Sequence, residues 1–345
     1  MHIPDGYLGP QTYLPAWGVM APAWAWAAAR LKRTLRRRQL PLMALAAAFT
    51  FVVMMFNVPL PGGTSGHAVG SVLVAVLLGP WAAVVAVSLA LGVQALLFGD
   101  GGITALAANC LTMAVIMPFA GWWTYRLLAG RAGSVPRRRA LAAGVGGYVG
   151  VNAAALATGL LLGIQPLAAH DALGRALYCP FGLAVAVPAM VIPHLLAIGF
   201  VEAAVTGLGL GYLMRTDPEI SIAATPGPGD RPLRRLAAAV AVLLLLAPLG
   251  LIAAARLGAG TAWGEWSAGE LEVIAGRLPA GFDRLASLWR APLPDYGLPG
   301  TENSPTASQA IWYGVSAALG VAVIVAAVLA LRRLAAGKGS GDAAP

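Results

Sequence analysis

The chain has 345 residues, of which 59% are hydrophobic and 11% are charged, and its formal net charge is +9. Ordinary soluble domains carry about a quarter charged residues, so the composition excludes a soluble globular protein and indicates a polytopic membrane protein. The positive charge does not indicate nucleic-acid binding, because the basic residues form short runs between apolar stretches, where they set orientation in the membrane. Cys110 and Cys179 lie in or beside apolar segments, which indicates neither a disulfide framework nor a thiolate cluster.

The first residues, MHIPDG, are polar or turn-forming, and the first basic run comes after the first apolar stretch. This is not the order of a signal peptide, so we expect the mature protein to keep Met1. The bulky second residue, His2, also disfavours removal of Met1 by aminopeptidases.

Apolar stretches of about 20 residues, the length that crosses a bilayer, predict nine membrane spans. They lie near residues 12–29, 40–60, 67–79, 80–98, 103–127, 139–163, 184–213, 236–255 and 310–331. The third is short, and prolines interrupt the stretch 172–213, where a half-helix would have to be buried in protein. The predicted fold class is an all-α polytopic membrane protein with seven helices followed by two C-terminal transmembrane helices.

The basic residues between these spans are unevenly distributed, with 18 of the 23 on one predicted side of the membrane. Those 18 lie in segments 30–39, 126–139, 214–235 and the tail from 332. The positive-inside rule then predicts an external N-terminus and a cytoplasmic C-terminus. Because successive loops alternate between the two sides of the membrane, the Gly-rich turns PLPGGTSGH at 59–67 and FGDGG at 98–102 are also predicted to lie outside, with MHIPDG.

The chain divides into two predicted units. Residues 1–213 form a seven-span unit with short loops, and the stretch 214–235, rich in Pro, Gly and Asp, is typical of a cytoplasmic linker. Residues 236–332 form a two-span module with an external loop at 256–309, and 333–345 form a cytoplasmic tail.

His2 is the most informative of the four histidines. The amine of Met1, the amide nitrogen of His2 and its imidazole can bind one metal through fused five- and six-membered chelate rings, leaving one corner of a plane open. Square-planar nitrogen coordination is typical of Ni(II) and Cu(II). The alternative is a terminal histidine that is frayed in solvent.

His67 ends the Gly-rich turn that is predicted to lie outside the membrane, as Met1 is. Its imidazole is therefore a candidate ligand for the fourth corner of the metal plane. The alternative is a helix-capping or interfacial histidine. His194 lies in an apolar segment eight residues before Glu202, on roughly one helical face with it. Buried ionisable groups in a membrane indicate function, but a helix-packing hydrogen bond explains His194 equally well.

Two further polar residues lie in predicted external loops. Asp100 in the FGDGG turn is a candidate partner that orients an imidazole, although turn formation is the simpler explanation. His170 beside Asp171 is typical of a solvated loop pair.

Five stretches occur together along the chain: MHIPDGYLGP at 1–10, PLPGGTSGHAVG at 59–70, GPWAAV at 79–84, QALLFGDGGITALAAN at 94–109 and HLLAIGFVEAAVTGLGLGYL at 194–213. In these stretches the chain resembles the CbiM/NikM family, the substrate-binding membrane subunits of energy-coupling-factor (ECF) cobalt and nickel transporters. The resemblance covers most of residues 1–213 and implies a seven-helix bundle like that of ECF S-components.

The resemblance implies that Met1 gives its amine, His2 its amide and imidazole, and His67 its imidazole to the metal. It also implies import of Ni(II) or Co(II) into the cell, with two ECF ATPase subunits and a coupling transmembrane T subunit as partners. The sequence contains no P-loop, so ATP hydrolysis belongs to the partners and the chain itself is not expected to be an enzyme. Beyond the transported ion, no cofactor is expected. Ni(II) is the expected preference, because planar nitrogen geometry suits it; Co(II) and Cu(II) stay open.

Residues 233–332 resemble the two-helix accessory subunit (NikN) that is fused to the C-terminus in some members. The stretch APLPDYGLPG at 291–300 carries this resemblance. The Pro-Asp-Gly-Leu-Glu element of that module has its nearest counterpart in SAGELEVIAG at 267–276.

Two other classes of function compete with transport. An intramembrane enzyme would hold a catalytic zinc with the histidines and Glu202, but no His-Glu-x-x-His helix supports it. A metal-sensing receptor would need a signalling domain, which neither soluble part resembles.

Overall fold

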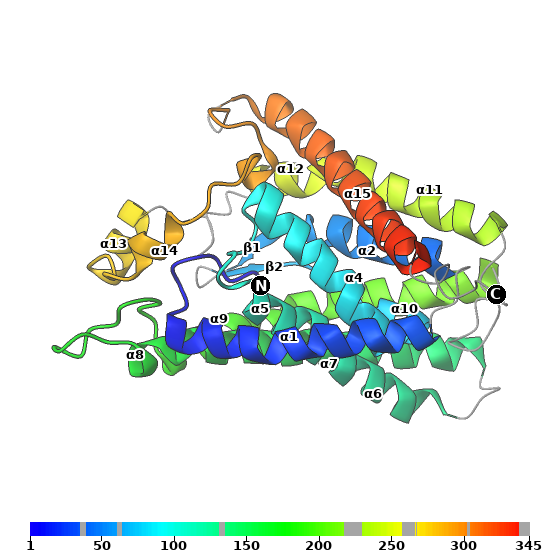
Figure 1. Ribbon diagram of the computed structural model, residues 1–345, viewed down its shortest axis with the longest axis horizontal. Coiled ribbons are helices and arrows are strands. Elements are labelled where there is room, and N and C mark those ends of the chain that lie inside the picture. Colours follow the sequence, from blue (N-terminus) through cyan, green and yellow to red (C-terminus); the bar gives the residue numbers. More distant parts are fainter. Residues whose placement is uncertain are drawn as a thin grey trace, which may run out of the picture.

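The computed structural model describes residues 1–34, 39–60, 64–130, 135–216, 230–256, 266, 268–301 and 304–337. Parts of the predicted linker, the external loop, the turn at 59–67 and the tail lie outside these residues. Within them the chain is almost entirely helical (Figure 1), with one antiparallel ribbon of two strands. The predicted all-α fold class is confirmed.

The N-terminal unit begins with α1 (Pro10–Thr34), α2 (Leu40–Met54), β1 (Val58–Leu60), β2 (Thr64–Gly66), α3 (Ser71–Leu78), α4 (Pro80–Val93) and η2 (Gln94–Phe98). It continues with α5 (Leu106–Asn109), η3 (Cys110–Ile116), α6 (Met117–Ala129), α7 (Pro136–Gly163), α8 (Gln165–Ala168), α9 (Leu183–Pro193), η4 (His194–Ile198) and α10 (Gly199–Thr216). The C-terminal part contains α11 (Asp230–Leu246), α12 (Pro248–Arg256), α13 (Ala268–Ala275), α14 (Phe282–Ala286), η5 (Pro294–Tyr296) and α15 (Thr306–Gly337).

Six helical stretches in the described residues are long and apolar enough to cross a membrane: Pro80–Phe98, Leu106–Ala129, Pro136–Ala168, Leu183–Thr216, Leu233–Ile252 and Thr306–Ala330. Each coincides with a predicted span. The third predicted span, 67–79, contains only the eight-residue helix α3. At 1.5 Å per residue it rises about 12 Å, less than half of the hydrocarbon thickness of about 30 Å. Gly70 and Gly79 bound it with φ angles of 69° and 91°, which interrupt helical backbone.

Glycines let α7 pack closely against its neighbours. A Cβ atom added to Gly146 would lie 2.6 Å from the carbonyl oxygen of Gly121 in α6, and one added to Gly147 would lie 3.0 Å from that of Glu202 in α10. Such close backbone contacts are typical of helix packing in membranes, where small residues form the interfaces. Helix α7 therefore fixes α10, which carries Glu202, against the rest of the bundle.

Three π-helical turns interrupt the α-helices of the N-terminal unit. The turn η2 begins at Gln94, η3 directly follows Asn109, and η4 begins at His194. Such turns are rare and are frequently found at functional sites. All three therefore begin at or beside a polar residue whose contacts are described below.

The C-terminal part packs onto the bundle through α15, which runs along α2 (Figure 1). A Cβ atom on Gly320 of α15 would lie 2.1 Å from the ring of Phe51 in α2, so the two helices approach closely there. The hydroxyl of Tyr313 donates a hydrogen bond to the carbonyl oxygen of Met55. The ring of Phe282 in α14 packs edge-on to that of Tyr7, with the centroids 5.3 Å apart, so the described residues 268–301 reach the beginning of the chain.

Candidate metal centre

The N-terminal arm, residues 1–9, is buried in the protein. Met1 is 2% exposed and Ile3 is 0% exposed. Asp5 anchors the arm, because its carboxylate accepts hydrogen bonds from the backbone N–H groups of Ile103 (2.9 Å) and Thr104 (2.8 Å) and from the Thr104 hydroxyl. Hydrogen bonds to a carboxylate are about twice as strong as those between neutral groups. The alternative interpretation, a terminus that is frayed in solvent, therefore does not hold, because these contacts fix the terminus in place.

Asn109 and Gly102 hold the backbone of Ile3 from two sides. The Asn109 side chain accepts a hydrogen bond from the N–H of Ile3 (2.8 Å) and donates one to its carbonyl oxygen (3.0 Å). The N–H of Gly102 donates to the same oxygen at 2.9 Å. A Cβ atom on Gly102 would lie 2.3 Å from the nitrogen of Asp5, so only glycine fits here. The residue that follows His2 is therefore fixed in place.

The N-terminus of the chain lies beside the β1–β2 ribbon (Figure 1), and Met1, His2 and His67 come together there. The amine of Met1 donates a hydrogen bond to the carbonyl oxygen of Ser65 at 3.0 Å and lies 3.5 Å from Nε2 of His67. The imidazole rings of His2 and His67 stack with their centroids 4.7 Å apart and an interplanar angle of 24°. His67 is 1% exposed. The structure thus brings together the groups that the sequence predicts as ligands.

The Met1 amine is electrostatically prepared for coordination. Burial lowers the pKa of this amine from 8.0 to about 5, against the opposing effect of the negative charge of Asp100. At neutral pH the amine is therefore uncharged, with a lone pair available. Only the neutral form of an amine can bind a metal.

Asp100 holds the imidazole of His2. Its Oδ1 lies 3.0 Å from Nδ1 of His2, while its Oδ2 accepts hydrogen bonds from the Tyr296 hydroxyl (2.5 Å) and from Nε2 of Gln94 (3.3 Å). Burial acts to raise the pKa of Asp100, but the charge interaction and hydrogen bond with His2 outweigh it, and the pKa lies below the ordinary value of 3.8. The group is therefore an ionised acceptor. The other ring nitrogen, Nε2 of His2, is buried without a hydrogen-bond partner in the described part of the chain.

Glu202 secures the turn that carries His67. Its carboxylate accepts hydrogen bonds from the N–H groups of Val69 (2.8 Å) and Gly70 (3.1 Å) and from the hydroxyl of Thr206 (3.1 Å). Glu202 is 0% exposed, so this membrane-embedded carboxylate is satisfied by the backbone two and three residues after His67. The sequence did not predict this contact, which joins positions 133 residues apart.

His194 makes the hydrogen bond of the helix-packing interpretation. Its Nδ1 donates a hydrogen bond to the carbonyl oxygen of Met190 at 2.6 Å, within its own helix. Its Nε2 is buried and has no hydrogen-bond partner among the residues that the structure describes. His194 also interacts electrostatically with the Met1 amine and with His67, so it belongs to the surroundings of the same centre.

Two other features lie apart from this chemistry. His170 is exposed, and beside it Asp171 pairs with Arg175 at 2.6 Å, as expected for a solvated loop.

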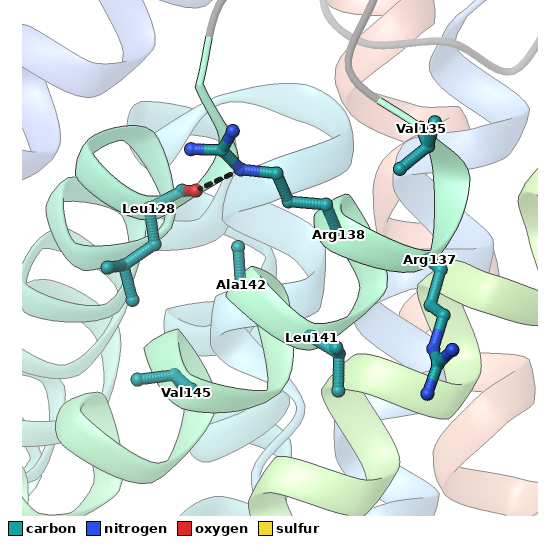
Figure 2. A pocket seen from close by; sticks show the side chains of 7 residues that line it. All are labelled: Leu128, Val135, Arg137, Arg138, Leu141, Ala142 and Val145. Atoms are coloured by element: carbon teal, nitrogen blue, oxygen red, sulfur yellow. Dashed lines mark hydrogen bonds between the residues drawn. The ribbon is translucent and has the colours of Figure 1, made fainter.

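A surface hollow of ≈ 360 Å³ at the junction of α6 and α7 is drawn in Figure 2. It is lined by Leu128, Val135, Arg137, Arg138, Leu141, Ala142 and Val145. In it the Nε of Arg138 donates to the carbonyl oxygen of Leu128 at 3.0 Å. The lining offers no imidazole, thiol or carboxylate for a metal.

Among the described residues, no group of three or more His, Cys, Asp or Glu side chains is arranged to hold a metal ion. A centre at this point therefore depends on main-chain nitrogens as well as imidazoles. Gln94 and Tyr296 are partners of Asp100 that the sequence does not predict. Tyr296 lies in the quoted stretch APLPDYGLPG, but its contact with Asp100 joins positions 196 residues apart, and no local pattern predicts it.

Comparisons with known proteins show the family to which the chain belongs. A family model, CbiM, described as the cobalt uptake substrate-specific transmembrane region, matches residues 2–220. The fused nickel transport protein NikMN of Rhodobacter capsulatus is 48% identical over 344 residues, which cover 95% of this chain and 96% of that protein. The probable fused nickel transport protein LarMN of Lactiplantibacillus plantarum is 46% identical over 274 residues, 79% of this chain and 80% of that protein.

A solved structure described as a transition metal transporter matches with a TM-score of 0.60 and 50% identity, covering 64% of this chain and 95% of its own. A truncated transition metal transporter matches with a TM-score of 0.59 and 50% identity over 63% of this chain and 99% of its own. The relatives from Rhodobacter capsulatus and Lactiplantibacillus plantarum are both named as fused nickel transport proteins. The chain therefore belongs to the CbiM family and is a multi-pass membrane transport protein in which a CbiM/NikM region is followed by a fused C-terminal module.

Proposed function

We propose that the chain is the substrate-binding subunit of an ECF transporter that imports Ni(II) in preference to Co(II). The ion is captured at the outer face by four nitrogens: the amine of Met1, the amide and imidazole of His2, and the imidazole of His67. Residues 1–213 form the metal-binding unit, 214–235 the linker, and 236–332 the accessory module. The N-terminus lies outside and the C-terminus in the cytoplasm, as the positive-inside excess predicts.

One observation carries this proposal: the neutral Met1 amine lies 3.5 Å from Nε2 of His67, both residues are buried, and the His2 ring stacks on that of His67. A terminus frayed in solvent would not be buried against an imidazole nitrogen, as this amine is. Ni(II) prefers square-planar nitrogen ligands, whereas Zn(II) prefers a tetrahedron. The donor set therefore supports a planar ion.

Capture requires one rearrangement of the His2 side chain. A six-membered chelate ring uses Nδ1, which in the structure lies 3.0 Å from Asp100. A half-turn of the imidazole about its Cβ–Cγ bond turns Nδ1 away from Asp100 and brings Nε2 round toward the carboxylate. A metal-bound histidine commonly donates its second ring N–H to a carboxylate, and Asp100 is in place to accept it.

The remaining steps of transport belong to partner subunits. The sequence has no P-loop, so two ECF ATPase subunits supply the free energy and a coupling T subunit transmits it. Release inside requires the arm, residues 1–9, to change its contacts. The amide of His2 regains its proton when the ion leaves, which lowers affinity at that moment.

The test is Ni(II) binding by isothermal titration in detergent, with any purification tag at the C-terminus. Four proteins are compared: the native chain, a chain with one residue added before Met1, His67→Ala, and His170→Ala as a control for the loss of an exposed histidine. Losing an outer partner of a ligand typically weakens metal binding about 10–100-fold. We therefore expect losses of at least about 100-fold for the extension and for His67→Ala, and no change for the control.

Equal binding by the extended chain would eliminate the Met1 amine as a ligand. Competition between Ni(II), Co(II) and Cu(II) in the same titration tests the metal preference. Tighter binding of Cu(II) follows from the general affinity order of divalent metals and leaves the site assignment intact, whereas a preference for Co(II) over Ni(II) would contradict the proposed selectivity.

A further inference from the structure

The C-terminal module reaches the metal centre through one residue, Tyr296 of η5. Its hydroxyl donates to Oδ2 of Asp100 at 2.5 Å and accepts a hydrogen bond from Nε2 of Gln94 at 3.0 Å. Because Gln94 supplies a proton to the tyrosine oxygen, the tyrosine proton is left for Asp100. The other carboxylate oxygen of Asp100 faces Nδ1 of His2 at 3.0 Å. A continuous hydrogen-bonded path thus runs from the fused module to His2.

The Tyr296 side chain is held on both sides of this junction. Its ring stacks on that of Phe98 in the N-terminal unit, with the centroids 4.7 Å apart and an interplanar angle of 19°. Within the module, the hydroxyl of Ser316 in α15 donates to the carbonyl oxygen of Tyr296 at 2.8 Å. The residue is 6% exposed. Packing alone therefore fixes the ring, while the hydroxyl makes a separate polar contact.

The backbone at this point is strained. Asp295 and Tyr296 have φ angles of 51° and 62°, and they are the only non-glycine residues with positive φ in the described part of the chain. Side chains disfavour this left-handed conformation. Two such residues in succession persist only where the surroundings hold them, and such strain concentrates at functional sites. A glycine at these positions would relieve the strain but would lose the tyrosine hydroxyl.

We propose that Tyr296 is a positioning residue of the metal centre: its hydroxyl orients Asp100, which in turn orients the imidazole of His2. This inference rests on the proposed function, in which His2 is a ligand. It gives the fused module a direct part in metal affinity. Removing the hydroxyl leaves Asp100 free to rotate, so the carboxylate is no longer held where it can accept the second ring N–H of a metal-bound His2.

The test uses Tyr296→Phe in the full chain, because this change deletes the hydroxyl and keeps the ring stack on Phe98. The matched control is Tyr313→Phe, which deletes a buried hydroxyl of the same module that donates to the carbonyl oxygen of Met55. We expect Ni(II) affinity to fall about 10-fold or more for Tyr296→Phe, the usual effect of losing an outer partner of a metal-bound histidine, and to change less than about twofold for the control.

Two further readouts separate positioning from general loss of structure. The visible absorption band of planar Ni(II) should shift or broaden in Tyr296→Phe and stay unchanged in Tyr313→Phe. In an Asp100→Asn background, Tyr296→Phe should cause little additional loss, because the hydroxyl acts through Asp100. Should Tyr296→Phe fail to fold, Gln94→Leu takes its place, since it removes the donor that directs the tyrosine proton.

Wild-type affinity in Tyr296→Phe, or in Gln94→Leu where that variant takes its place, would overturn the inference. So would a loss that persists in full in the Asp100→Asn background. The proposed function fails in a different way, namely if the native chain binds Ni(II) without needing its free amine or His67. The two failures are therefore distinguishable in one series of titrations.

Discussion

The number of protons released on metal binding follows from the burial of the Met1 amine. With its pKa lowered from 8.0 to about 5 by burial, the amine is only about 1% protonated at pH 7, whereas an exposed amine with the ordinary pKa would be about 90% protonated. Binding at pH 7 should therefore release about one proton, from the His2 amide. An exposed amine would add almost one more.

The sign of the pH effect is fixed by competition between protons and metal. Affinity falls as pH falls, by about tenfold per pH unit between pH 8 and 6 for the single amide proton, and by about a hundredfold per unit below pH 5, where the amine is also protonated. Docking of the N-terminal arm, residues 1–9, onto the rest of the protein also weakens as pH falls. At about 1.4 kcal/mol per pKa unit, the undocked arm binds a proton more strongly than the docked arm by about 4 kcal/mol, so docking is stabilised as pH rises from 5 to 8.

The assay is isothermal titration with Ni(II) in two buffers of different ionisation enthalpy, at pH 5, 6, 7 and 8. The slope of the observed enthalpy against the buffer enthalpy gives the proton count. About two protons at pH 7 would refute the buried neutral amine. A count of zero, with affinity constant from pH 8 to 5, would refute coordination by the amide.

Two substitutions test the supports of the centre. Gly102→Ala places a Cβ atom 2.3 Å from the nitrogen of Asp5. Overpacking of this kind costs about 1–3 kcal/mol, so the Ni(II) affinity measured by titration should fall about 10-fold or more. The control is Gly92→Ala, whose added Cβ atom meets nothing within 4 Å and which should bind Ni(II) as the native chain does. Glu202→Gln weakens the charged hydrogen bonds from the N–H groups of Val69 and Gly70, each worth about 1.5–3 kcal/mol. The thermal unfolding midpoint in detergent should therefore fall by several degrees. An unchanged midpoint would show that this carboxylate does not secure the turn.

Much of the helical framework follows directly from the sequence, because an apolar run of spanning length has few alternatives in a membrane. The fourth predicted span, 80–98, coincides with Pro80–Phe98, where Pro80 begins the helix. The third did not extend as predicted, since hydropathy does not register that glycines at both ends of α3 take positive φ angles. Segment length and backbone breaks must therefore be weighed together.

The candidate centre divides in the same way. Because successive loops alternate between the two sides of the membrane, the sequence predicts that Met1 and His67 lie on the same side. In the structure the Met1 amine lies 3.5 Å from Nε2 of His67. The supports of the centre did not follow, because they join distant positions: Glu202 to the turn after His67, and Tyr296 to Asp100. Such contacts depend on how helices pack, which periodicity within one segment does not encode.

The three π-helical turns lie within helical segments that are long and apolar enough to cross a membrane. Each such turn closes its hydrogen bonds one residue later than an α-helix does. Deleting a single residue from Gln94–Phe98 would remove the extra residue that the wider turn holds and would restore α-helical bonding. The wide turn thus absorbs one residue of chain length without turning the helix before it, and Asp100, which follows η2, is bonded back to its first residue through the hydrogen bond from the Asp100 N–H to the carbonyl oxygen of Gln94 at 3.2 Å.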